Sequence, residues 1–86
     1  MISFTYTLKD PMGLHARPAG ALAKEVRQYK SKITITAKGQ TVEVVRLIAV
    51  MRLGTKAGDK VTFSLEGEDE AAASAALQSF LERISC

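Results

Sequence analysis

The chain has 86 residues, of which 47% are hydrophobic and 24% charged, and its formal net charge is +3. A chain of this size holds one modest core and no deep enclosed pocket, so we expect a single domain over residues 1–86. Its net positive charge is compatible with nucleic acid, phosphorylated compounds or acidic protein surfaces as partners and does not distinguish between them. The sequence has no signal-peptide pattern and no apolar run near the roughly 20 residues of a membrane span, so we expect a cytoplasmic protein without membrane insertion.

The first half of the chain predicts a strand, a helix and a hairpin. Apolar and polar residues alternate from Ile2 to Leu8, which indicates a half-buried strand. Pro18 is tolerated only in a first helical turn, so a helix begins at about Ala16 or Arg17. Strands over 33–37 and 41–44, joined by the turn "KGQ", form the hairpin. The apolar stripe of the helix consists of Ala19, Leu22, Ala23, Val26 and Tyr29.

The second half predicts a short helix, a strand and a longer helix. Val44, Leu47, Ile48 and Met51 have helical spacing, and Gly54 follows as a helix-ending glycine does. A strand with Val61, Phe63 and Leu65 on one face comes next. The acids of "EGEDE" then favour the N-terminus of the last helix. The apolar stripe of that helix consists of Ala73, Ala76, Leu77, Phe80 and Ile84.

The order of these elements predicts the fold class. Each strand has one apolar face and each helix has one apolar stripe, so all of them can be buried around a single sheet. We therefore expect an α+β open-faced sandwich with the order βαββαβα. Its four-stranded, mostly antiparallel sheet carries three helices on one face and serine and threonine on the other.

The stretch "MGLHARPAG" at residues 12–20 contains the only histidine. It places His15 next to the helix start, where backbone N–H groups and the positive end of the helix dipole favour an anion such as phosphate. Arg17 adds a guanidinium suited to phosphate oxygens. Because the dipole and a nearby cation both disfavour the imidazolium, His15 is expected to stay neutral near pH 7 and to act as a nucleophile for a phosphoryl group.

The residues alone leave other interpretations of His15 open. It is equally well explained as a helix-capping side chain without a catalytic role. A metal site would need more ligands than one histidine and the remote Cys86, and no cofactor motif is present. A nucleic-acid-binding module would need aromatic residues on the open face of the sheet, whereas Phe4, Tyr6 and Phe63 are assigned to the buried face.

Two stretches, "GLHARPA" and "GQTVEVVRLIAVMRLG", resemble the signatures of the HPr family, the histidine-containing phosphocarriers of the phosphoenolpyruvate-dependent sugar phosphotransferase system. The resemblance covers essentially the whole chain. It implies that enzyme I, charged from phosphoenolpyruvate, phosphorylates His15 on Nδ1, and that the group then passes to EIIA domains of sugar permeases. Arg17 would pair with the phosphoryl group, backbone groups of Ala16 and Arg17 would bind it, and Pro18 would start the helix. Such a protein is a monomeric covalent carrier rather than an independent enzyme, and it needs no cofactor.

The second stretch implies a surface for docking to both partners. An apolar stripe on a short helix is more often core than interface, so both interpretations stay open. If Ile48 and Val50 face the sheet, Leu47 and Met51 share a different, exposed face. Arginine and lysine side chains would surround this patch for acidic partners. The expected docking residues are Leu47, Ile48, Met51, Gly20, Lys24 and Arg27, with Arg17, Arg46 and Arg52 as further cations.

Arg46 departs from many family members, which have a regulatory serine at this position. Because Arg46 has no hydroxyl, we expect no regulation by phosphorylation there. A paralogous carrier in a nitrogen-related phosphorelay has the same chemistry, and the sequence does not separate it from a sugar-system carrier.

Overall fold

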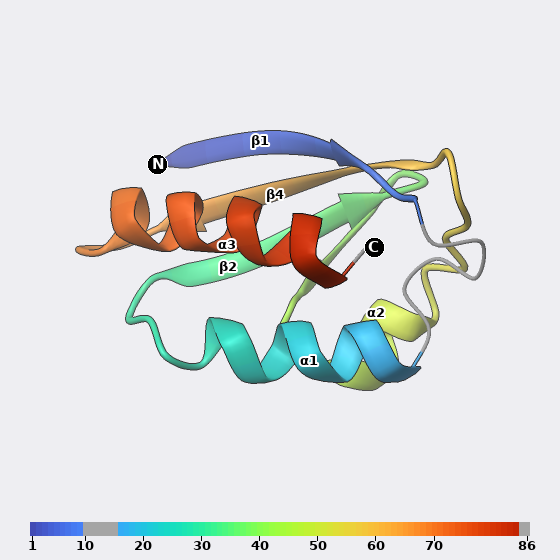
Figure 1. Cartoon of the computed structure of the whole chain (residues 1–86), viewed down its shortest axis with the longest axis horizontal. Coiled ribbons are helices and arrows are strands. Elements are labelled where there is room, and N and C mark those ends of the chain that lie inside the picture. The colour runs from blue at the N-terminus through green and yellow to red at the C-terminus, as the bar shows by residue number, and fades with distance from the viewer. Residues whose placement is uncertain (10–15, 85–86) are drawn as a thin grey trace.

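The computed structural model describes residues 1–9 and 16–84, and its element order is βαββαβα, as predicted (Figure 1). The strands are β1 (Ile2–Thr7), β2 (Lys32–Ala37), β3 (Gln40–Glu43) and β4 (Lys60–Glu66). The helices are α1 (Ala16–Val26), α2 (Leu47–Met51) and α3 (Glu70–Ile84). None of the helices in this described part is long and apolar enough to cross a membrane.

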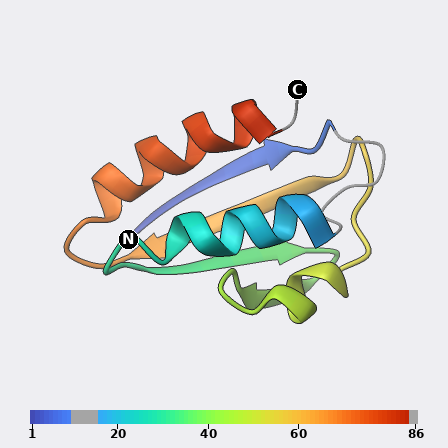
Figure 2. The same ribbon diagram turned by 60° about the horizontal axis from the view of Figure 1, so that its bottom comes forward.

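The strands form one sheet in the order β1-β4-β2-β3, and each neighbouring pair is antiparallel. The last strand in the chain, β4, therefore lies inside the sheet between β1 and β2. Helices α1 and α3 run across one face of this sheet, and α2 lies beside α1 (Figures 1 and 2). The predicted open-faced α+β sandwich is confirmed.

The core lies between the sheet and the helices. Alternation places Val61, Phe63 and Leu65 of β4 on the buried face, and each of these side chains is fully buried. Phe63 stacks on Phe4 of β1, its partner in the register, with the ring centroids 5.3 Å apart. The largest fully buried side chains that the other elements contribute are Leu22, Ile35, Val44, Val50, Leu77 and Leu81.

The opposite face of the sheet is lined by hydroxyl groups in register. Thr5, Thr62, Thr36 and Thr41 follow one another across the four strands. The Oγ1 atoms of Thr36 and Thr41 are 2.7 Å apart, and those of Thr5 and Thr62 are 3.2 Å apart. Helices cover only the other face, so these small polar side chains meet solvent, as the alternation predicts.

Three details of the predicted helices are wrong. Helix α1 ends at Val26, so Tyr29 lies beyond it. Val44 does not belong to the second helix, because its N–H continues the sheet by donating to the carbonyl oxygen of Ile33 at 3.1 Å. Helix α2 is therefore only the five residues from Leu47 to Met51. In α3 the buried stripe runs through Ala73, Leu77 and Leu81, whereas Ala76 is half-buried. The side chain of Ile84 lies outside the described residues.

A joint far from the start of α1 fixes the opposite end of the molecule. The carboxylate of Asp69 accepts hydrogen bonds from the N–H groups of Lys30 (2.8 Å) and Ser31 (2.9 Å), and from the Ser31 hydroxyl. These bonds, led by the one from the hydroxyl, hold the pKa of Asp69 below its usual value. At Gly67 the backbone passes so close that a Cβ would lie 2.6 Å from the Cα of Ser31. The loop before β2 and the loop before α3 are thus locked together.

Candidate functional site

The predicted helix start is confirmed, because α1 begins at Ala16. The first N–H groups of any helix lack intrahelical acceptors, so the backbone of Ala16 and Arg17 belongs to the turn that can bind an anion. The first turn contains no acidic residue to neutralise it. His15 is the residue directly before this turn, but it lies outside the described residues, so its geometry stays a prediction.

Arg17, Lys24 and Arg27 are all exposed on or just beyond α1. Within residues 1–9 and 16–84, none of these three side chains forms an ion pair. Their charges are therefore available to an acidic partner as far as the described part of the chain is concerned. Pro18 is the third residue of α1, where its missing N–H costs the helix no hydrogen bond.

Gly20 is half-buried in α1, and a Cβ added there would meet nothing within 4 Å. The helix is thus thinly covered at this point, close to its start. A partner surface can approach its backbone here more closely than a larger residue would allow.

Helix α2 separates its residues into an exposed and a buried set. The side chain of Ile48 is 61% exposed and that of Met51 is 37% exposed, whereas Val50 is 1% exposed. Leu47 is half-buried and packs against the core. Ile48 therefore does not face the sheet, which was one of the possibilities left open by the sequence, and it is more exposed than Leu47. Ile48 and Met51, three residues apart on one helical surface, are called the α2 patch below.

Cations border the α2 patch. A hollow of about 440 Å³ lies beside it, lined by Arg46, Leu47, Ile48, Ala49 and Arg52. Figures 1 and 2 both place α2 next to the half of α1 that starts at Ala16, so the helix that carries the patch lies beside the start of α1. An apolar surface with a positive rim suits a partner with an apolar surface and an acidic rim.

Sequence reasoning missed Val45, which is 37% exposed just before α2. The signal was present in the adjacent apolar pair Val44–Val45, because two neighbouring residues at a strand end point to opposite sides. Only one of them can then be buried by the sheet. As for metals, the described part of the chain contains no group of three or more histidine, cysteine, aspartate or glutamate side chains that could hold an ion.

Comparison with known proteins identifies the family. Residues 2–83 match the family model described as the PTS HPr component phosphorylation site. The phosphocarrier protein HPr of Mycoplasma genitalium is 38% identical over 84 residues, which cover 96% of each chain. The chain belongs to the HPr family of phosphocarrier proteins of the phosphotransferase system.

Solved structures agree with this assignment. The histidine-containing phosphocarrier protein of a mycoplasma superposes with a TM-score of 0.93 at 32% identity, covering 98% of this chain and 96% of the other. The crystal structure of HPr-C-His from Thermoanaerobacter tengcongensis gives a TM-score of 0.89 at 33% identity, covering 95% and 92% of the two chains.

Proposed function

We propose that His15 accepts a phosphoryl group from phosphorylated enzyme I and passes it to an EIIA domain of a sugar permease. The observation that carries the proposal is a family match that includes His15, joined to a helix that starts at the next residue and has an exposed arginine in its first turn. As a histidine nitrogen bonds to phosphorus, the bond between phosphorus and the donor breaks. Phosphoryl transfer of this kind asks the carrier mainly for positioning and charge stabilisation.

The first turn of α1 supplies that stabilisation in the proposal. The N–H groups of Ala16 and Arg17 and the positive end of the helix dipole favour the anionic group once it is attached. The guanidinium of Arg17 pairs with phosphoryl oxygens, and Pro18 sets the helix start without removing a needed hydrogen bond. In this proposal the protein works as a monomer in the cytoplasm, between two partners and without a cofactor.

The α2 patch is proposed to dock both partners in turn. Ile48 and Met51 supply apolar contact, and so does the half-buried Leu47, which also packs against the core. Lys24 and Arg27, together with Arg46 and Arg52, steer acidic partner surfaces toward the patch. Gly20 allows close approach beside the start of α1.

Regulation by a serine kinase is not expected at position 46. Arg46 directly precedes α2, and its Nε lies 3.9 Å from a carboxylate oxygen of Glu43. This side chain adds positive charge at the patch, whereas a phosphoserine would add negative charge. Incubation with an HPr kinase and ATP should leave the chain unmodified, and phosphate on a hydroxyl near α2 would contradict this part of the proposal.

The decisive experiment is phosphorylation by enzyme I and phosphoenolpyruvate, followed by intact mass and phosphorus NMR. The native chain should gain one acid-labile phosphoryl group, and the His15→Ala variant should gain none while keeping its circular dichroism spectrum. Because His15 is the only histidine, no second site can substitute for it. An Arg17→Gln variant should still be phosphorylated, but more slowly by roughly tenfold or more, as expected when one charge-assisted contact to the phosphoryl group is lost.

Transfer from the labelled carrier to a purified EIIA domain tests the second half of the proposal. Failure of several sugar-system enzymes I to label the chain would overturn the proposed role. If only an enzyme I of a nitrogen-related relay labelled it, the carrier chemistry would stand and the branch would be reassigned.

A further inference from the structure

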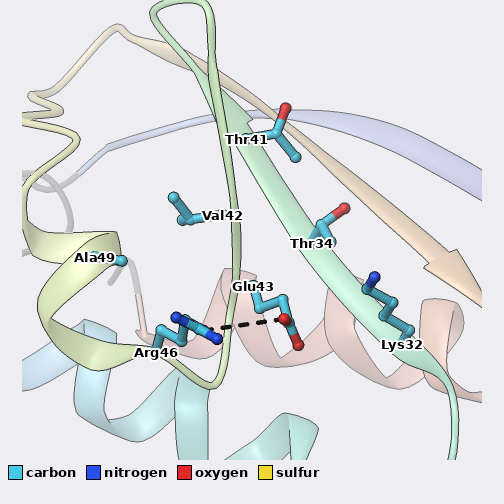
Figure 3. Close-up of a pocket in the computed structure, with 7 residues that line it drawn as sticks. All are labelled: Lys32, Thr34, Thr41, Val42, Glu43, Arg46 and Ala49. Atoms are coloured by element: carbon cyan, nitrogen blue, oxygen red, sulfur yellow. Dashed lines mark ion pairs between the residues drawn. The ribbon is translucent and has the colours of Figure 1, made fainter.

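In the described part of the chain, β3 is an edge strand of the sheet, and its outer edge lies within a groove. The groove has a volume of about 360 Å³ and is lined by Lys32, Thr34, Thr41, Val42, Glu43, Arg46 and Ala49. Figure 3 shows Val42 on the side of α2, with Ala49, and Thr41 and Thr34 on the side of the open sheet face. The groove therefore wraps around the edge of β3 and is bordered by a helix on one side.

The hydrogen bonds of β3 show which backbone groups point into this groove. The turn between β2 and β3 consists of Lys38 and Gly39, both with positive φ (52° and 79°), as in two-residue hairpins. Residues 40, 42 and 44 then bond toward β2, in agreement with the bond from the Val44 N–H to Ile33. The N–H and C=O of Thr41 and the N–H of Glu43 consequently point outward, while the Glu43 carbonyl accepts the N–H of Arg46 at 3.0 Å.

We propose that the edge of β3 binds an extended acidic peptide segment by strand addition. The peptide would donate to and accept from the backbone of Thr41 and accept from the N–H of Glu43. Main-chain pairing gives affinity in this binding mode, and pockets for alternate side chains give specificity. This proposal concerns a different surface chemistry from the phosphoryl transfer at His15 and does not depend on it.

Alternation along the bound strand defines the partner. Side chains on one of its faces would meet Val42 and Ala49, which are apolar and leave room for a branched side chain. Side chains on the other face would meet Lys32 on the side of the open sheet face. Arg46 reaches toward Glu43 from the side of α2, at the Glu43 end of the bound segment, and both cations are exposed. A segment that alternates apolar and acidic residues fits both faces, whereas a basic segment would place its cations against these two side chains.

The ion pair between Glu43 and Arg46 competes with the partner. Its atoms are 3.9 Å apart, and the two side chains are 43% and 72% exposed. Exposed pairs of this kind hold weakly, so a peptide carboxylate can replace Glu43 as the partner of Arg46. Figure 3 shows the pair at the Glu43 end of the strand, where the incoming segment would meet it.

The test titrates the full chain with a short acetylated peptide of alternating glutamate and valine, and with its lysine–valine counterpart as the matched control. We expect amide NMR shifts at Thr41 and Glu43 with the acidic peptide only. The Thr41 N–H should also become protected from hydrogen exchange, which contacts made through side chains alone would not cause. No shift and no protection at Thr41 at the highest peptide concentration would overturn the proposal, as would equal binding of both peptides.

Variants of the chain separate the contribution of backbone hydrogen bonds to peptide binding from that of the charged side chains. Thr41→Pro removes the outward N–H together with the hydroxyl that bonds to Thr36, and it should weaken binding by roughly tenfold or more. Thr41→Val removes the hydroxyl alone and should change binding by about twofold at most. Should the proline variant fail to fold, the same test is made by titrating the native chain with a peptide in which every second amide is N-methylated. Glu43→Gln should tighten binding about two- to fivefold, and Arg46→Gln should weaken it by a similar factor. Every second amide of the peptide points to the same side, so two peptides, each N-methylated on one of the two sets, are tested. Strand addition would be excluded if binding survived Thr41→Pro and also survived methylation of each set.

Discussion

The two ends of α1 differ in how they are held. At its far end, the loop up to Ser31 is fixed by three hydrogen bonds to Asp69 and by the close approach of Gly67. At its start, the described structure shows an exposed Arg17, an open Gly20 and the neighbouring α2 with its exposed apolar patch. One end is therefore fixed by buried and hydrogen-bonded contacts, and the other keeps side chains exposed to solvent, where a partner can reach them. Substitutions at the two ends should separate stability from phosphoryl transfer.

Effects on stability and effects on phosphoryl transfer should differ most within α2, between substitutions of Val50 and of Ile48. Val50→Ala empties a fully buried position and should lower the free energy of unfolding by about 2–3 kcal/mol. Ile48→Ala removes a side chain that is 61% exposed and should leave stability nearly unchanged, yet raise the KM for phosphoryl transfer from enzyme I by roughly tenfold. Urea unfolding and steady-state transfer assays measure the two effects. Equal losses of stability in both variants would mean that Ile48 belongs to the core.

Gly67→Ala tests the joint between the loop before β2 and the loop before α3, where the two backbones pass closely. The added Cβ would meet backbone as well as side-chain atoms of Ser31, so the loops must separate, and stability should fall by about 1–3 kcal/mol. Phosphorylation of the folded protein at His15 should keep its native rate, because the joint is at the other end of α1. A slowed rate with unchanged stability would show that the two ends are coupled.

Asp69→Asn should make stability less dependent on pH. The pKa of Asp69 is lowered in the folded chain, so its contribution is fully present above the ordinary value of about 3.9 and is lost as pH falls through the lowered pKa. The native chain should therefore have a higher Tm than the variant near pH 7, and the gap should close in acid. Scanning calorimetry from neutral to acidic pH measures it. A gap that stayed constant would show that the charge of Asp69 is not responsible.

The smallest effect is expected for Gly20→Ala, which is the counterpart of Gly67→Ala. The new Cβ has open space inside a helix, so the substitution should stabilise the fold by about 0.5–1 kcal/mol. Thermal unfolding detects the gain. A loss of stability here would mean that the start of α1 is more crowded than the described residues show.

Local patterns predicted the order of elements, the buried face of each strand and the start of α1 at Ala16. They failed where burial depends on distant parts of the chain. Helix α2 has five residues, too few for a stripe to show which side faces the core, so the sequence left open whether Ile48 faces the sheet or solvent. The acids before α3 were attributed to the helix dipole alone, whereas Asp69 bonds to residues 38 and 39 positions earlier. No local spacing can indicate such a pairing.

The place of β4 inside the sheet has a consequence for how the protein is made. Strand β1 pairs only with β4 in the described sheet, and β4 also pairs with β2. During synthesis, β1 has no partner strand until residues 60–66 have left the ribosome, so a sheet that includes β1 cannot form on a shorter nascent chain. Such pairing between sequence-distant strands slows folding and delays it until β4 has been synthesised. Until then the apolar faces of β1 and of the β2–β3 hairpin stay exposed to chaperones, and a chain that stops before β4 is a target for proteolysis.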